Sequence, residues 1–149
     1  MLEISHLSKT YSGGKKAVED LSFSVASGEI VGFIGHGAGK TTTLRCVAGI
    51  LDYTEGTIVV DGHDMHKQAI QAKQMMAFLP DNPDMYEFLT GIGYLKFIAD
   101  IYSIPQDVRT QLIGKYADAF EMTKVLGDLI GSYSHGMKQK LALISALMR

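Results

Sequence analysis

The chain has 149 residues, of which 46% are hydrophobic and 20% are charged, a composition suited to one compact soluble domain with a buried core. The formal net charge is −2 and no block of Lys or Arg occurs, which argues against non-specific binding to nucleic acid or anionic lipid. The single cysteine, Cys46, excludes an internal disulfide framework and fits a reducing compartment. No window approaches the about 20 apolar residues of a membrane span, so a membrane would be reached only through a partner.

The first forty residues indicate strands that lead into a glycine-rich loop. Alternating apolar residues predict two strands, at residues 2–5 and 21–25, joined across residues 11–16. A third apolar run, Ile30–Ile34, does not alternate and predicts a strand buried on both faces. After the glycine-rich segment the apolar residues recur at i, i+3, i+4 and i+7, which predicts a helix with one apolar side, formed by Leu44, Val47, Ala48 and Leu51.

The rest of the chain is predicted to change from mixed structure to helices alone. Residues 57–60 predict a strand, residues 68–74 a short helix, and a further short apolar run at 75–79 is stopped by Pro80. Two helical faces follow, Tyr94, Leu95, Ile98, Ile101 and Tyr102, then Val108, Leu112, Tyr116 and Phe120. We therefore expect an α/β core, residues 1–83 and 133–149, that carries a helical subdomain at residues 84–132.

The final segment shows helical spacing again at Met137, Leu141, Ile144 and Met148. It ends at Arg149 without a helix-stop glycine, a polar tail or a following strand, so we expect the chain to be cut within a larger domain.

A phosphate-binding loop is predicted where the third apolar run meets the helix. Glycines let successive backbone N–H groups turn inward toward an anion, and the helix that follows presents the positive end of its dipole. Lys40 would neutralise the β- and γ-phosphates, and the Thr41 hydroxyl would hold Mg²⁺. The alternative is an ordinary glycine turn before a threonine-capped helix. The residues expected to line the phosphate site are Gly35, Gly37, Ala38, Gly39, Lys40, Thr41 and Thr42.

The loop is one residue shorter than the standard pattern. That pattern places four residues between its first glycine and the glycine before the lysine, whereas only His36, Gly37 and Ala38 separate Gly35 from Gly39. One missing residue removes up to about 3.5 Å of chain, so the ring of N–H groups is expected to close less well around the β-phosphate.

A second motif, residues 133–140, resembles the signature sequence of the ABC-family ATPases. The usual form is Leu-Ser-Gly-Gly-Gln followed by a basic residue, Gln and another basic residue. The matching residues here are Ser134, Gly136, Lys138, Gln139 and Lys140, while Tyr133, His135 and Met137 depart from the form. A serine hydroxyl, a glycine N–H and a helix start together make an anion site. The resemblance implies that Ser134 and Gly136 close on the γ-phosphate of ATP held by a partner subunit; the alternative is a plain serine-capped helix.

The same resemblance assigns roles to residues elsewhere in the chain. Tyr11 resembles the family's aromatic residue that stacks on adenine. Asp81 stands where the family usually carries a glutamine that contacts Mg²⁺, and residues 82–90 resemble the region that meets the membrane subunit. The family's metal-binding aspartate and catalytic glutamate, which follow a later apolar strand, find no match in these 149 residues.

The resemblance implies an α/β phosphate-loop NTPase core with a mixed sheet and an all-helical subdomain. It further implies an ATP-binding motor subunit of an ABC-type transporter, with ATP and Mg²⁺ as cofactors and Lys40 as its catalytic residue. A membrane-spanning subunit and a second ATP-binding subunit would be its partners, at the cytoplasmic face of the cell membrane, and no nucleic acid is expected. Two alternatives remain open: a soluble ABC ATPase of DNA repair or translation, and a nucleotide-binding or interaction module without hydrolysis.

Overall fold

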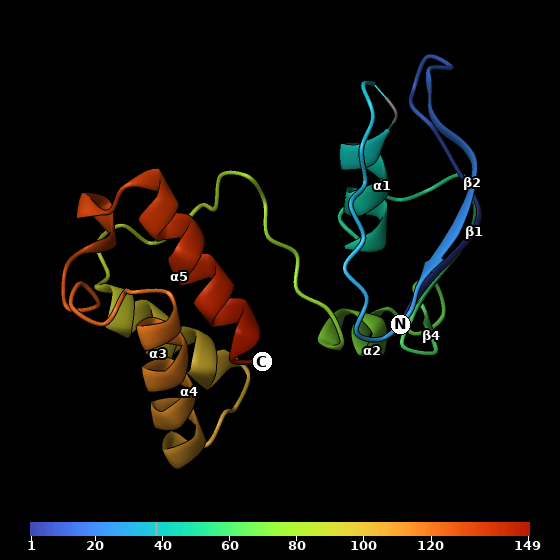
Figure 1. The fold of residues 1–149 in the computed structure, drawn as a ribbon. Helices are drawn as coiled ribbons and strands as arrows, with labels where there is room; N and C mark the ends of the chain where they lie inside the picture. The colour runs from blue at the N-terminus through green and yellow to red at the C-terminus, as the bar shows by residue number, and fades with distance from the viewer. Residues whose placement is uncertain (38) are drawn as a thin grey trace. The chain divides into compact units, whose positions relative to one another are not determined.

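The computed structural model describes residues 1–37 and 39–149, which divide into two compact units, residues 1–78 and 79–149 (Figure 1). Ala38, one of the predicted phosphate-loop residues, lies outside the described residues. Each unit has its own cluster of buried apolar side chains, and each is described by itself. Among the described residues no helix is both long and apolar enough to cross a membrane.

The first unit is built on a small antiparallel sheet. Its strands are β1 (Leu2–Thr10), β2 (Lys16–Val25), β3 (Glu55–Val60) and β4 (His63–Asp64), in the spatial order β2-β1-β3-β4. Each described pair of neighbouring strands is antiparallel. The three strands predicted from alternating or short apolar runs at 2–5, 21–25 and 57–60 are therefore confirmed, because each half-buried strand finds a hydrogen-bonded neighbour.

Two helices, α1 (Lys40–Val47) and α2 (Ala69–Gln74), complete the first unit (Figure 1). Both were predicted, but the predicted apolar side of the first helix is partly wrong. Thr43 and Cys46 are the buried residues of α1, whereas Leu44 is 48% exposed. Residues at i and i+3 share one helix face, and that face of α1 joins the core. The core of this unit consists of Ile4, Leu7, Val18, Cys46, Ile58, Val60, Met65 and Ala72.

The prediction of a doubly buried strand at Ile30–Ile34 is wrong for this structure. The segment has neither helix nor strand, and Ile30 and Ile34 are 101% and 92% exposed. A strand exists only when a neighbour receives its backbone hydrogen bonds, and no backbone hydrogen bond joins residues 30–34 to another described residue. The short apolar run at residues 75–79 likewise forms neither helix nor strand.

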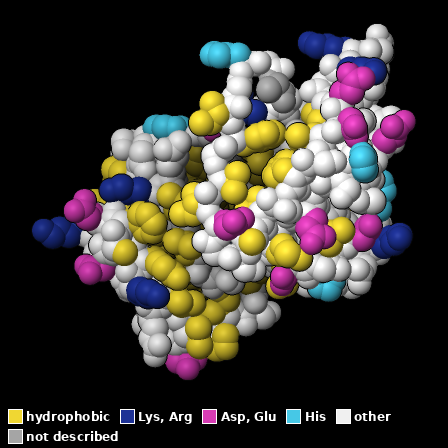
Figure 2. All heavy atoms as spheres, turned by 45° about the vertical axis from the view of Figure 1, so that its right-hand side comes forward, with side chains coloured by type: hydrophobic (Ala, Val, Ile, Leu, Met, Phe, Trp, Pro, Cys, Tyr) yellow, Lys and Arg dark blue, Asp and Glu magenta, His cyan; other side chains and the backbone are white. Residues whose placement is uncertain are grey.

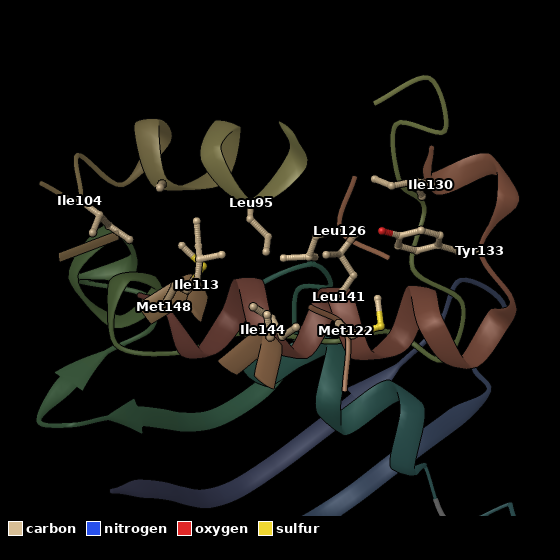
Figure 3. Close-up of a cluster of buried hydrophobic side chains, with 12 residues drawn as sticks. Leu95, Ile104, Ile113, Met122, Leu126, Ile130, Tyr133, Leu141, Ile144 and Met148 are labelled. Carbon is tan, nitrogen blue, oxygen red and sulfur yellow. The ribbon is translucent and has the colours of Figure 1, made fainter. Parts of the chain in front are cut away.

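The second unit is helical, with α3 (Gly91–Ile101), α4 (Gln106–Ala119), the 3₁₀ turn η1 (Ile130–Ser132) and α5 (His135–Leu147). Side chains from the three helices point toward one another in its core (Figure 3). The core consists of Leu95, Ala99, Ile104, Ile113, Ala117, Met122, Leu126, Ile130, Tyr133, Leu141, Ile144 and Met148. The predicted helical spacing of the final segment is confirmed, since α5 buries Leu141 and Ile144.

Three residues of the two helical faces predicted further upstream lie at the surface instead. Ile101, Tyr102 and Val108 are exposed, whereas Ala99, Ile113 and Ala117 take buried positions. The helix α5 lies against α3 and α4 in the second unit. The assignment of residues 133–149 to the ATP-binding core, and the boundaries at 84 and 132, stay predictions.

Candidate phosphate-binding site

A cavity of about 310 Å³ lies at the amino end of α1, near the lower limit of about 300 Å³ for ligand pockets. Its lining comes from the β1–β2 turn, the start of β2, the glycine-rich loop and the first turn of α1. The lining residues are Tyr11, Lys15, Lys16, Ala17, Gly37, Gly39, Lys40, Thr41 and Thr42. Six of the predicted binding residues are thus brought to one place, although they come from segments about thirty residues apart.

Gly39 shapes the loop because no other residue fits its position. It precedes α1 with φ of 70°, a left-handed backbone conformation, and its carbonyl oxygen accepts the first helical hydrogen bond from the N–H of Thr43 at 2.7 Å. A Cβ atom on Gly39 would lie 2.3 Å from the carbonyl oxygen of Ala17 and 2.8 Å from Cγ2 of Val18. The loop therefore lies directly against the start of β2. Gly37 is also left-handed, at φ 63°, but faces open space.

Lys40 begins α1 and its ammonium group stays within its own loop. The Nζ atom donates a hydrogen bond to the carbonyl oxygen of Gly35. The loop that is one residue short thus bends back far enough for these two groups to meet. The first turn of α1 contains no acidic residue, so no carboxylate competes with an anion for the amino end of the helix.

Tyr11 lines the same cavity and directly follows β1. Its hydroxyl shares a hydrogen bond of 3.3 Å with Oγ1 of Thr42, and the residue is 39% exposed. The ammonium of Lys9 lies 5.5 Å from the ring centroid. An aromatic ring with exposed area next to the start of α1 has the chemistry to receive a base. The adenine-stacking role of Tyr11 stays a prediction.

Lys15, Lys16 and Ala17 line the cavity without having been predicted as site residues. The signal was present in the sequence, because Gly13 and Gly14 predict a tight turn and a hairpin places residues after the turn beside those before it. The observed register pairs Thr10 with Lys16, which puts both lysines next to Tyr11. The sequence pattern by itself predicts residues 11–16 only as a connection between strands.

The predicted signature residues lie in the second unit, at the start of α5. Ser134 is the N-cap, and its Oγ accepts a hydrogen bond from the N–H of Met137 at 3.3 Å. Gly136 faces open space. Lys138 forms an ion pair of 2.5 Å with Glu87. The start of α5 therefore has the capped geometry that both the anion-site prediction and its plain alternative require.

Tyr133 of this motif stabilises the helical unit. Its ring is buried in the helical core, and its hydroxyl donates a 2.5 Å hydrogen bond to the carbonyl oxygen of Val125. Burial raises the pKa of this phenol. A Cβ atom on Gly91 would lie 2.3 Å from the Tyr133 hydroxyl oxygen, so the tyrosine occupies space that the glycine leaves free.

Asp81 also belongs to the second unit, and its side chain is exposed. Its backbone carbonyl accepts a hydrogen bond of 3.1 Å from the Gln139 side-chain amide, beside a cavity of about 220 Å³. No cluster of three or more His, Cys, Asp or Glu side chains suited to a metal occurs among residues 1–37 and 39–149. The predicted metal contacts of Thr41 and Asp81 stay predictions.

Comparison with known proteins places this chain in a family. The sequence model of the family described as "ABC transporter" matches residues 18–149. Two Bacillus subtilis proteins are similar over 99% of the chain: the uncharacterized ABC transporter ATP-binding protein YhcH, 31% identical, and the ABC transporter ATP-binding protein NatA, 33% identical. The chain spans 48% and 62% of their respective lengths.

A solved structure of an ATP-binding subunit of an ABC transporter is similar over 99% of the chain, with 28% identity and a TM-score of 0.90. The chain covers 62% of that structure. This likeness confirms the predicted fold class, a phosphate-loop core together with helices.

Proposed function

The chain belongs to the ABC transporter family, and we propose that it is the ATP-binding part of a motor subunit that drives a membrane transporter. The observation that carries this proposal is the cavity at the start of α1. Residues predicted to bind nucleotide meet around it: Lys40 and Thr41 from the loop pattern, and Tyr11 from the family resemblance.

The residues present fit a phosphate group. Gly39 leaves no room for a side chain, which supports a loop built for close backbone approach, and Gly37 keeps its backbone open toward space. Among the described residues that line the cavity none is acidic, while three are lysines. A polyanion would therefore meet a favourable electrostatic field from the lysines and from the amino end of α1.

We assign the following tasks to this chain's own groups. The Lys40 ammonium leaves the Gly35 carbonyl and balances charge on the β- and γ-phosphates. The Thr41 hydroxyl would hold Mg²⁺, which would supply charge neutralisation at the phosphates, and Asp81 is a second candidate contact for the metal. Ser134 and Gly136 contact the nucleotide of a second ATP-binding subunit, because a capped helix start offers N–H groups to an anion.

The proposed setting follows from family membership and is part of the same proposal. The partners are a membrane-spanning subunit and a second ATP-binding subunit, alike or different, at the cytoplasmic face of the membrane. By itself this chain is expected to turn ATP over slowly, because its 149 residues contain no match to the family's catalytic glutamate. No observation in the structure favours DNA repair or translation as the setting.

Calorimetric titration with Mg-ATP tests the proposal. The 149-residue chain should bind ATP, and Lys40→Ala should weaken binding by at least about tenfold, the loss expected for one charge-assisted phosphate contact. Lys124→Ala, which removes an exposed lysine from the second unit, is the matched control and should bind like the parent chain. Equal affinities for the parent and the Lys40 variant would refute the site.

A further inference from the structure

The β1–β2 turn holds a second lysine at the wall of the same cavity. The N–H of Tyr11 donates to the carbonyl oxygen of Lys15 at 2.9 Å, and the N–H of Gly14 donates to the carbonyl oxygen of Tyr11 at 3.0 Å. Gly13 and Gly14 take the left-handed conformations, φ 95° and 79°, that close this tight turn. The backbone of Lys15 is therefore held next to Tyr11 by this hydrogen bond. Lys15 and Lys40 both line the cavity.

The lysines near the cavity differ in how their ammonium groups are engaged. Lys16 contacts the carboxylate of Glu19, and this hydrogen bond raises the pKa of Lys16. Lys9 lies over the ring of Tyr11, and Lys40 donates to the Gly35 carbonyl. The ammonium group of Lys15 forms no hydrogen bond or ion pair with any residue that the structure describes. It is thus a cavity-lining cation whose charge no nearby carboxylate neutralises.

We propose that Lys15 contacts the phosphate chain of the bound nucleotide and raises the affinity of the site for polyphosphates. The inference rests on the proposed nucleotide-binding function, and it adds a residue that family membership does not assign. An ammonium on a long stem reaches an anion held at the amino end of α1 without any change in the turn that carries it. The contact is charge-assisted, and it lies at an exposed residue, so dissolved salt must weaken it.

The experiment compares Lys15→Gln with the parent chain by titration with Mg-ATP and with inorganic tripolyphosphate, at low and at high salt. Lys15→Gln should weaken both ligands by about fivefold at low salt, the effect of one partly screened ion pair, and by less at high salt. Lys15→Arg keeps the charge and should restore the affinity. Lys124→Gln removes the same charge from the second unit and should leave the affinity unchanged.

The outcomes separate this inference from the proposed function. If the parent chain binds neither ligand, the nucleotide site and the role of Lys15 both fail. If the parent binds ATP and Lys15→Gln binds it equally well, only the role of Lys15 fails. If Lys15→Gln weakens binding but Lys15→Arg does not restore it, or if salt does not change the difference, the residue acts through the shape of the turn and the charge contact is refuted.

Discussion

At the scale of single residues, Gly39 is the position of the phosphate loop where we expect a substitution to be most destabilising. We expect Gly39→Ala to destabilise the chain more than Gly37→Ala does. Both substitutions place a side chain on left-handed backbone, at a cost of about 1–2 kcal/mol. Only the Cβ at residue 39 also meets the Ala17 carbonyl, which adds about 1–3 kcal/mol of overpacking. Urea unfolding of the two variants measures the difference, and equal losses would mean that the loop does not lie against β2 as the structure shows.

A second prediction for a single residue concerns Cys46 and the pH dependence of the free energy of unfolding. Its side chain is fully buried, and burial raises the pKa of the thiol. In the unfolded chain the thiol ionises near its ordinary pKa of about 8.5, so the unfolded state binds fewer protons above that pH. The contribution of Cys46 to stability is therefore complete below about pH 8.5. It is lost as the pH rises toward the folded-state pKa, at no more than about 1.4 kcal/mol per pH unit.

Urea unfolding between pH 7 and pH 10 tests this dependence, with Cys46→Ala as the comparison. The variant starts less stable because it leaves a small cavity, so the slope against pH is the informative quantity and not the absolute free energy of unfolding. The parent chain should lose stability more steeply than the variant above about pH 8.5. Parallel curves would show that the thiol is not buried.

At the scale of elements, Ser134 has two roles that substitutions can separate: it caps α5, and it is proposed to contact the γ-phosphate. Ser134→Ala removes the acceptor for the Met137 N–H and should lower the free energy of unfolding by about 1 kcal/mol. Ser134→Asp keeps a good cap and should keep the stability, but it places a negative charge where the proposed γ-phosphate contact lies. Thermal unfolding reports the cap. An unchanged stability of Ser134→Ala would show that this cap does not stabilise α5.

The elements predicted correctly from the sequence are those with a local residue pattern and a neighbouring element in the same unit. The β1–β2 hairpin forms from alternating residues and β3 from a short apolar run, and each strand has a neighbour in the same unit. The helix α5 forms from apolar residues that repeat on one face. Ile30–Ile34 has the apolar content of a buried strand, yet a strand also needs a neighbouring backbone, which no sequence pattern in the segment reports. The apolar side of α1 failed for a related reason. Small Thr43 and Cys46 fill the space against the sheet, and larger Leu44 does not.

The residues of the candidate site also divide into those that a local sequence pattern predicts and those that depend on contacts between distant segments. The glycines, Lys40 and Thr41 were predictable because the phosphate loop is a local pattern of consecutive residues. Tyr11 was predictable only through the family resemblance. Lys15 and Lys16 were missed, since their place beside α1 depends on how the hairpin docks against the loop. That docking involves contacts between segments distant in sequence, such as Gly39 against Ala17.

At the scale of the whole molecule, exposed apolar side chains raise the question of self-association. Figure 2 shows many hydrophobic side chains at the surface, and those of Ile30, Val31 and Ile34 are each more than half exposed. Their segment also leaves its backbone N–H and C=O groups without partners among the described residues. Exposed apolar residues on an unpaired extended backbone are the combination that favours pairing with another copy.

We therefore expect the 149-residue chain to associate with itself as its concentration rises, and sedimentation velocity measures this directly. A variant with both Ile30→Ser and Ile34→Ser should remain monomeric over the same range, because it loses the apolar contacts. Its free energy of unfolding should stay within about 0.5 kcal/mol of the parent value, since neither side chain is buried. Leu129→Ser, which replaces an exposed leucine outside the segment, should associate like the parent chain. A parent chain that sediments as a monomer at every concentration would show that the exposed segment does not pair with a second copy.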